Sequence, residues 1–441
     1  MTGIELCTKI IERIKAAIHS PEFVDTYRQD KHFMRTRKLT MPILMTYLLG
    51  YSKSSMNCAI SDFLQEHEMS LETVLGKELT SFTKQAVTKT RKGIKIDAFE
   101  WLMNLSAQMY FEAVSSANLW LGYLLFAIDG SDIQLPQRET CLKTYGGLKA
   151  GSTPFAMAKF SILYCVSHNI IVDALLDTCK AAERPMAKTH ISALVRKGLA
   201  EKAVVLFDRG YYSEDLCAYM LQKNVHFVFR IKSNDVFIKT VTGSRKRKFD
   251  FEIPMDNGET VPVRLVRFKL NTGEYEYLLT DLTDPAITCK DFKELYFMRW
   301  PIELKFRQLK QRFALENFSG YSSDAIDQDY FIAVFYSNLL EILKMDSDTQ
   351  IEQEWSKKLE AMPPNKRPNY TYQSNTAIIV HKLKSALPAV LLWEVMPLSA
   401  CKEIVSKAAQ RTNWSQINDD RHYERKVRQP GRNVHYNQKP C

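Results

Sequence analysis

One segment of the chain combines a carboxylate, two cations and a tyrosine at spacings that a helix would bring together. The segment is ELYFMRWPIELKFRQLKQRF, residues 294–313. Tyr296, Arg299, Glu303 and Lys310 are three, four and seven positions apart, which places them within an arc of about 60° on one helix. The pattern indicates either an amphipathic helix with a salt-bridged surface or part of a reactive site. An apolar stripe is predicted beside this arc, made of Leu295, Met298, Ile302, Phe306, Leu309 and Phe313.

A proline inside this segment limits how the helix can run. Pro301 has no backbone N–H to donate, so it is tolerated in the first turn of a helix but kinks a helix interior. Either a helix starts at Pro301 or one helix bends there. In the first case the arc holds only for Glu303 and Lys310.

Two aspartates follow apolar runs that are typical of buried strands. They are Asp129 in FAIDGSD and Asp208 in LFDRGYYS. The ends of buried strands are where α/β proteins place ligands and catalytic groups, although an aspartate there also forms turns or caps helices. Together with Glu303 the two aspartates make a three-carboxylate set for two divalent ions, an arrangement that suits phosphodiester chemistry. Asp132 is interpreted as a turn-forming or supporting acid.

The elements around these acids predict an α/β core with a mixed sheet. Strands are expected from 121 to an Asp-Gly-Ser turn at 129–131, at 156–178 with a turn at His168-Asn169, and at 202–207 and 225–232. Helices are expected at 188–199 and from Ser213, which is placed to cap the second one. Strands followed by helices favour this fold class. Residues 233–290 then predict an antiparallel β insertion, because Asp-Asn-Gly and Asn-Thr-Gly turns separate its short strands.

The flanking regions are predicted to be mostly helical. In residues 1–115, Ser81 or Thr83 is placed to cap a basic helix, which lies either in a DNA groove or in solvent. Residues 346–441 contain two helical patterns and a basic tail. The cluster at 245–248 is either a solvated hairpin tip or a phosphate contact.

Composition narrows the class of protein. The formal charge of +10 favours a polyanionic partner, and the apolar fraction of 45% is that of a globular chain. Nine scattered cysteines without a C-x-x-C pair indicate neither a disulfide framework nor a zinc site. His168, His190 and His226 lack metal-ligand spacing and are interpreted as structural. With no signal-peptide pattern and no apolar run of about 18 residues, a cytoplasmic protein without a membrane partner is expected.

Taken in order, the strand-end aspartates, the β insertion and Y-x2-R-x3-E-x6-K resemble the DDE transposases of bacterial insertion sequences, and more narrowly insertion-sequence family four. The resemblance covers about residues 80–320. It implies a ribonuclease-H-like core in which Asp129, Asp208 and Glu303 hold two Mg2+ ions, with Mn2+ as a substitute. In some relatives an insertion tryptophan stacks on a base flipped from a DNA hairpin. Residues 210–299 contain no Trp.

The resemblance also implies an activity and its partners. The expected enzyme binds the terminal inverted repeats of its element in double-stranded DNA, cleaves phosphodiester bonds and joins the 3′-OH ends to target DNA, as a homodimer in the synapse. Tyr296, Arg299 and Lys310 would contact phosphates. Further DNA contacts are expected from Arg209, Arg245, Lys246, Arg247, Lys248, Lys89, Arg91 and Lys92.

The expected segments are a helical DNA-binding domain at 1–115, a catalytic domain at 116–345 and a helical region at 346–441 with a role in dimerisation. Two alternatives remain at this point. One is a nuclease of related fold that does not join strands, and the other is an inactive, host-adopted DNA-binding relative.

Overall fold

The chain forms two compact units. The computed structural model describes residues 1–34, 38–50, 55–75, 81–114, 119–150, 153–232, 235–241, 243–254, 260–270 and 273–416. One unit, here the sheet unit, is Val114–Gln311, and the other, the helical unit, combines Met1–Ala113 with Arg312–Cys441. This division differs from the three expected segments, because residues 312–345 group with both ends of the chain.

The helical unit is held together by its longest helix. Helix α14, Ser323–Glu360, packs against α1, Gly3–Ile18, and α16, Pro397–Gln410. The backbone N–H groups of Gly3 and Ile4 each donate to Asp346 at 2.7 Å, so a side chain of α14 satisfies the first turn of α1. The remaining helices are α2 Pro21–Tyr27, α3 Met41–Gly50, α4 Met56–Glu66, α5 Glu68–Leu75, α6 Lys84–Arg91, α7 Asp97–Val114 and α15 Thr376–Leu391.

The expected helical character of both flanking regions is confirmed, with one addition. A small hairpin pairs β10, Tyr370–Gln373, with β11, Asn413–Gln416, after the short 3-10 helix Pro364–Lys366. The expected basic tail lies wholly outside the described residues, the last of which is Gln416. Within the described ranges, no helix combines the length and the apolar character that crossing a bilayer requires.

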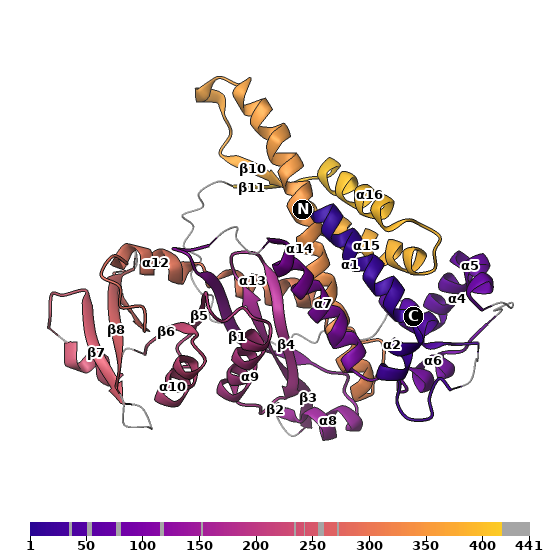
Figure 1. The fold of residues 1–441 in the computed structure, drawn as a ribbon, viewed down its shortest axis with the longest axis horizontal. Coiled ribbons are helices and arrows are strands. Elements are labelled where there is room, and N and C mark those ends of the chain that lie inside the picture. The colour runs from indigo at the N-terminus through magenta and orange to yellow at the C-terminus, as the bar shows by residue number, and fades with distance from the viewer. Residues whose placement is uncertain are drawn as a thin grey trace. The chain divides into compact units, whose positions relative to one another are not determined.

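The sheet unit is built on a mixed sheet in which β1, Leu124–Gln134, lies between β3 and β5 (Figure 1). On one side β1 pairs antiparallel with β3, Thr153–Cys165, which also pairs antiparallel with β4, Ile170–Thr178. On the other side β1 pairs in parallel with β5, Ala203–Phe207, and β5 in parallel with β6, His226–Arg230. Short strand β2, Gly147–Ala150, follows α8, Glu139–Tyr145, and pairs with β3. The mixed sheet of the expected ribonuclease-H-like core is confirmed.

The antiparallel insertion extends this sheet instead of forming a separate one. Its strands are β7 Lys248–Pro254, β8 Thr260–Lys269 and β9 Tyr275–Thr280, preceded by the short helix α11 Val236–Val241. Strand β9 pairs antiparallel with β6, so the insertion is hydrogen-bonded to the core. That pairing joins the insertion to the strand beside β5.

Helices cover both faces of the sheet. Helix α9, Glu183–Arg196, contacts the face that carries Ser161, because its His190 lies 3.0 Å from the Ser161 hydroxyl. Helix α13, Pro301–Gln311, contacts the opposite face, where the Phe306 ring packs on Phe160 at 5.0 Å between centroids. Neighbouring residues of a strand point to opposite faces, so these two contacts fix the layering. Ser213 caps α10, Glu214–Gln222, as expected.

The proline question has a definite answer. Helix α12, Cys289–Phe297, ends before the segment Met298–Trp300, and α13 begins at Pro301. The first alternative is therefore correct, and the single-helix arc is wrong for Tyr296 and Arg299. Met298 does not belong to the buried stripe, because it lies in the connecting turn and is 42% exposed.

Arg91 is a structural residue, and its expected role as a DNA contact is wrong. Helix α6 is capped by Thr83, as one of the two alternatives predicted, but Arg91 in its last turn is only 1% exposed. Its guanidinium donates to Gln328 at 2.8 Å, to Ser319 at 2.6 Å and to Asp329 at 3.2 Å. The side chain therefore joins α6 to α14 inside the helical unit.

Replacing Asp329 by Asn is expected to destabilise the helical unit. Removing one charge of a buried pair leaves the other uncompensated, which costs roughly 3 kcal/mol in free energy of unfolding. Chemical denaturation would measure the loss. The control is Glu352→Gln on the same helix, an exposed position where a change within about 0.5 kcal/mol is expected. Equal stability of the two variants would contradict a stabilising role for the pair.

Candidate active site

Asp129 and Asp208 lie side by side at one edge of the parallel strands. Asp208 follows Phe207, the last residue of β5, as expected. Strand β1 does not end at Asp129, and the expected Asp-Gly-Ser turn is wrong, because β3 continues to pair with β1 as far as Gln134. Strand β5, however, pairs with β1 only through Ala127 opposite Leu206. Asp129 and Asp208 are thus each two residues beyond the last paired positions, at the same level of the sheet.

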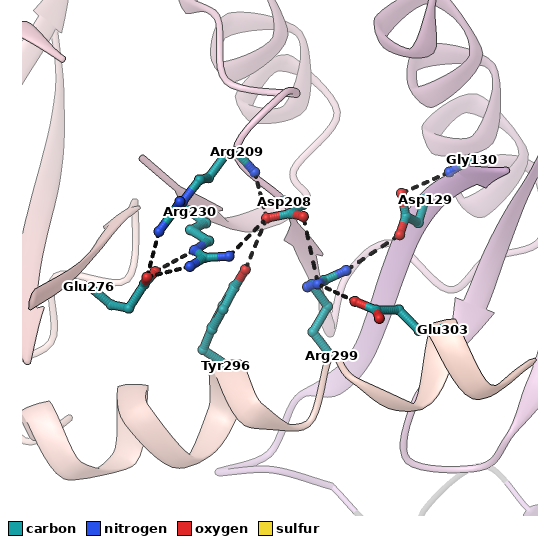
Figure 2. Close-up of polar contacts among 9 residues, drawn as sticks. All are labelled: Asp129, Gly130, Asp208, Arg209, Arg230, Glu276, Tyr296, Arg299 and Glu303. Carbon is teal, nitrogen blue, oxygen red and sulfur yellow. Dashed lines mark hydrogen bonds and ion pairs between the residues drawn. The ribbon is translucent and has the colours of Figure 1, made fainter. Parts of the chain in front are cut away.

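The guanidinium of Arg299 lies among all three predicted carboxylates (Figure 2). One terminal nitrogen is 3.4 Å from Asp129, and the other is 3.7 Å from Asp208 and 3.1 Å from Glu303. Arg299 is 5% exposed and sits in the turn between α12 and α13. One cation therefore bridges acids from β1, from the end of β5 and from α13.

The two remaining signature residues contact the same strands. The Tyr296 hydroxyl, at the end of α12, donates to Asp208 at 3.4 Å. Lys310, two turns beyond Glu303 on α13, donates to the Ser131 hydroxyl at 2.9 Å and to the Asp132 carbonyl at 2.7 Å. The structure therefore brings all four signature residues against the aspartate edge, although they come from two helices and a turn.

The two aspartates differ in their electrostatic environment. Burial raises the pKa of Asp129 to about 6, and the charge of Arg299 and the N–H of Gly130 offset only part of that effect. Burial also raises the pKa of Asp208, but the N–H of Arg209 and the charges of Arg299 and Arg230 outweigh it and lower the pKa overall. Asp129 is therefore the harder of the two aspartates to ionise.

A divalent ion fits this site by the chemistry of its donors. Three carboxylates offer hard oxygen ligands, which Mg2+ and Mn2+ prefer. In the described part of the chain, no three acidic, histidine or cysteine side chains are already close enough to hold an ion. Because Arg299 lies between the three acids, an ion would have to take its place and draw the oxygens inward.

A second cluster supports Asp208 and was not predicted from the sequence. Arg230, the last residue of β6, lies 3.5 Å from Asp208 and donates from two nitrogens to Glu276 on β9. Glu276 is 4% exposed and also accepts from Arg209 at 2.6 Å (Figure 2). The strand-end argument used for Asp208 would also have found Arg230. Nothing in the sequence pairs β9 with β6, so Glu276 had no comparable signal.

The other predicted DNA contacts come from elements that carry none of the carboxylates. Arg245, Lys246 and Arg247 are exposed before β7, and Lys248 begins that strand and donates to the carbonyl of Ile287. Lys89 and Lys92 are exposed on the helical unit. Their role as DNA contacts stays a prediction.

The histidines are placed as expected. His190 is buried between Asp173, at 2.7 Å, and Ser161. His226 contacts Asp281 at 2.7 Å, and its pKa is raised by that hydrogen bond against the opposing effect of burial. His168 is buried. Each is part of the packing of the sheet unit.

The fold and the site together define an α/β domain that gathers three carboxylates where the parallel pairing of two strands ends. The chain belongs to the transposase DDE domain family, whose model matches residues 120–339. Among known proteins it is similar to "Putative transposase InsZ" of Escherichia coli (strain K12), with 24% identity over 170 residues. It is also similar to "Transposase InsG for insertion sequence element IS4" of the same organism, with 22% identity over 295 residues.

These similarities cover parts of the proteins. The aligned segments span 38% of this chain and 54% of InsZ, and 63% of this chain and 63% of InsG. The chain thus spans less than two thirds of either relative. Among solved structures, the piggyBac transposase in a synaptic complex with hairpin DNA aligns with 93% of this chain and 85% of its own, at 12% identity and a TM-score of 0.45.

The raised pKa of Asp129 predicts a pH-dependent difference in stability. Between pH 4 and 6 the folded protein retains a proton that the unfolded chain has lost, so the free energy of unfolding falls as pH rises through that window. Asp129→Asn removes this effect. In EDTA, the free energy of unfolding of Asp129→Asn, measured relative to that of the wild type, should rise by up to about 3 kcal/mol between pH 4 and 6.

Urea denaturation across this pH range would measure the difference. Asp132→Asn is the control, because it removes a charge from the same strand at a position that is 45% exposed. A constant offset between Asp129→Asn and the wild type from pH 4 to 6.5 would show that burial does not perturb Asp129.

Proposed function

We propose that this protein is a cut-and-paste transposase that cleaves DNA at the ends of its element and joins the freed 3′-OH ends to target DNA. The observation that carries the proposal is the convergence of Asp129, Asp208 and Glu303 on one guanidinium. That site lies inside the region matched by the transposase DDE domain. Related proteins are named transposases, one of them for the element IS4.

In this proposal the three carboxylates hold two Mg2+ ions, for which Mn2+ can substitute. Bound there, divalent ions would stabilise charge on the oxygens of a phosphodiester. The pKa of Asp129 is raised and that of Asp208 is lowered, and this difference supports a site that binds a further cation. A cation beside Asp129 would favour its ionised form, which burial disfavours.

The signature residues would hold the phosphate against the acids. Burial raises the pKa of Tyr296 to about 12, so its hydroxyl stays protonated and remains a donor at neutral pH. Arg299, once released from the carboxylates, has a planar fork that suits a phosphate oxygen pair. Lys310 offers a compact cation two helical turns away.

The partners follow from the same proposal. The formal charge of +10 favours a DNA polyanion, and the expected substrates are the terminal inverted repeats and a target duplex. Pairing two ends requires two copies of the chain, so a homodimer is expected in the synapse. Helices α14, α15 and α16 are proposed to contribute to that contact.

Asp208→Asn is expected to abolish Mg2+-dependent cleavage of a duplex that carries the element's end. Loss of one of three carboxylates should lower the rate on the order of 10³-fold or more, while end binding persists. Gel assays of cleavage and of binding would measure both effects. Asp132→Asn is the control and should cleave. Full cleavage by Asp208→Asn would exclude the proposed site.

A strand-transfer assay separates the proposal from its alternatives. With pre-cut ends and a target plasmid, a transposase gives joined products, whereas a nuclease of related fold gives none. A protein that binds ends but never cleaves in Mg2+ or Mn2+ would instead be an inactive relative.

Arg299→Gln is expected to make the stability of the protein depend on metal. Without the guanidinium, three neighbouring carboxylates lose a shared cation. A loss of about 2 kcal/mol would lower the Tm in EDTA by roughly 4–8 °C. Mn2+ should restore the Tm, because it binds the folded site and replaces the missing charge.

Differential scanning fluorimetry would measure this effect without any activity assay. Arg307→Gln, an exposed arginine on α13, the helix that follows Arg299, is the control and should show no such dependence. If Mn2+ does not raise the Tm of Arg299→Gln above its effect on the control, the carboxylates do not bind the ion.

A further inference from the structure

One hollow in the sheet unit is lined by positively charged side chains, and none of the three carboxylates lines it. Its volume is about 640 Å3, and it is formed by the loop before β7, the facing ends of β8 and β9, and the first turns of α12. It is here called the basic cradle. Its cations are Arg245, Arg247, Arg267, Lys269, Lys290 and Lys293.

The charge of the cradle is largely uncompensated. Among the described residues that line it there is no acidic side chain. Lys290 has a carboxylate neighbour on its own helix, Glu294 at 3.7 Å, but both side chains are well exposed, at 83% and 57%. An exposed pair of this kind contributes little. Six cations around one hollow repel one another, so an anion bound there would be stabilised by all of them.

The floor of the cradle is rigid because Arg267 is fixed on several sides. Its guanidinium lies 5.0 Å from the ring centre of Tyr275 and 5.8 Å from that of Phe249. It also donates to the carbonyl of Ser244 at 2.6 Å and to that of Lys246 at 2.7 Å, which fastens the basic loop to β8. The backbone of the loop that carries Arg245 and Arg247 is therefore held in place before any ligand arrives.

Helix α12 links the cradle to the candidate active site. Lys290 and Lys293 lie in its first turns, where the helix dipole adds positive potential, and Tyr296 lies near its other end. Tyr296 is six positions after Lys290, or about 9 Å farther along the helix axis. For a duplex whose axis runs parallel to α12, with a rise of about 3.4 Å per nucleotide, this offset corresponds to roughly three nucleotides.

We propose that the basic cradle binds the phosphate backbone of a DNA strand about three nucleotides from the bond positioned at the carboxylates. The choice of DNA as the strand rests on the proposed function. The contact needs no metal, because Lys and Arg neutralise phosphates directly. Its role is to hold the strand in register while Tyr296, at the other end of α12, faces the reacting phosphate.

The test compares two double variants in EDTA. Lys290→Gln/Lys293→Gln removes two cations of the cradle. Lys143→Gln/Lys202→Gln removes two exposed lysines elsewhere in the sheet unit, and Lys143 pairs with Glu139 at the same helical spacing as Lys290 with Glu294. Fluorescence anisotropy with a labelled duplex would give affinity over a salt series. Thermal melts would confirm that all proteins are folded.

The cradle variant should bind about tenfold more weakly at 0.1 M salt. The slope of log affinity against log salt should fall by about 2, since each phosphate contact contributes about 0.9. The control should match the wild type. A second measurement replaces single phosphates by neutral methylphosphonates, and the substitution about three nucleotides from the cleavage site should weaken the wild type but not the cradle variant.

Unchanged affinity and salt slope in the cradle variant would overturn the proposal, as would an equal loss in the control. If millimolar inorganic phosphate displaces the duplex more than chloride does at the same ionic strength, the cradle is a site for free phosphate instead. Failure of the proposed function looks different. If DNA binding depends on the cradle but the protein never cleaves in Mg2+, the cradle proposal stands and the proposed transposase function fails.

Discussion

The arrangement of the sheet unit depends on one shared cation. Arg299 lies within 4 Å of Asp129, Asp208 and Glu303, which come from three separate segments of the chain. Three carboxylates this close repel one another, and burial makes Asp129 harder to ionise. The guanidinium offsets part of this cost and holds the acids together. The fold of the unit brings these four side chains to one point.

Two features of the fold meet that requirement. Parallel pairing of β1 with β5 sets Asp129 level with Asp208, and the longer β3 keeps β1 extended past the point where β5 ends. Helix α12 ends at Phe297 and α13 starts at Pro301. Arg299 therefore sits in the turn between them and reaches all three acids. In a continuous helix, Arg299 and Glu303 would lie on one surface, and the backbone at Arg299 could not turn toward the two aspartates. The insertion takes part as well, since Glu276 on β9 holds Arg230 against Asp208.

The helical unit shows how the same residue types serve structure alone. Arg91 lies in a basic helix that is typical of a DNA-binding surface, yet it is buried and bonded to Ser319, Gln328 and Asp329. Lys89 and Lys92 of the same helix are exposed. Which charges of an amphipathic helix face the protein depends on partners more than two hundred residues away. Charge and spacing alone do not separate the two cases.

The sequence by itself determined the strands that carry Asp129 and Asp208, the mixed α/β class, the antiparallel insertion and the start of a helix at Pro301 as one of two alternatives. These features rest on local patterns, namely apolar runs, turn residues and the missing N–H of proline. Only the tertiary structure decided that Arg299 bridges the acids and that Glu276 supports Asp208. It also decided that Arg91 is buried and that a basic cradle forms where β8, β9 and α12 meet. Each of these depends on strand register or helix packing between distant segments, which no short stretch of sequence encodes.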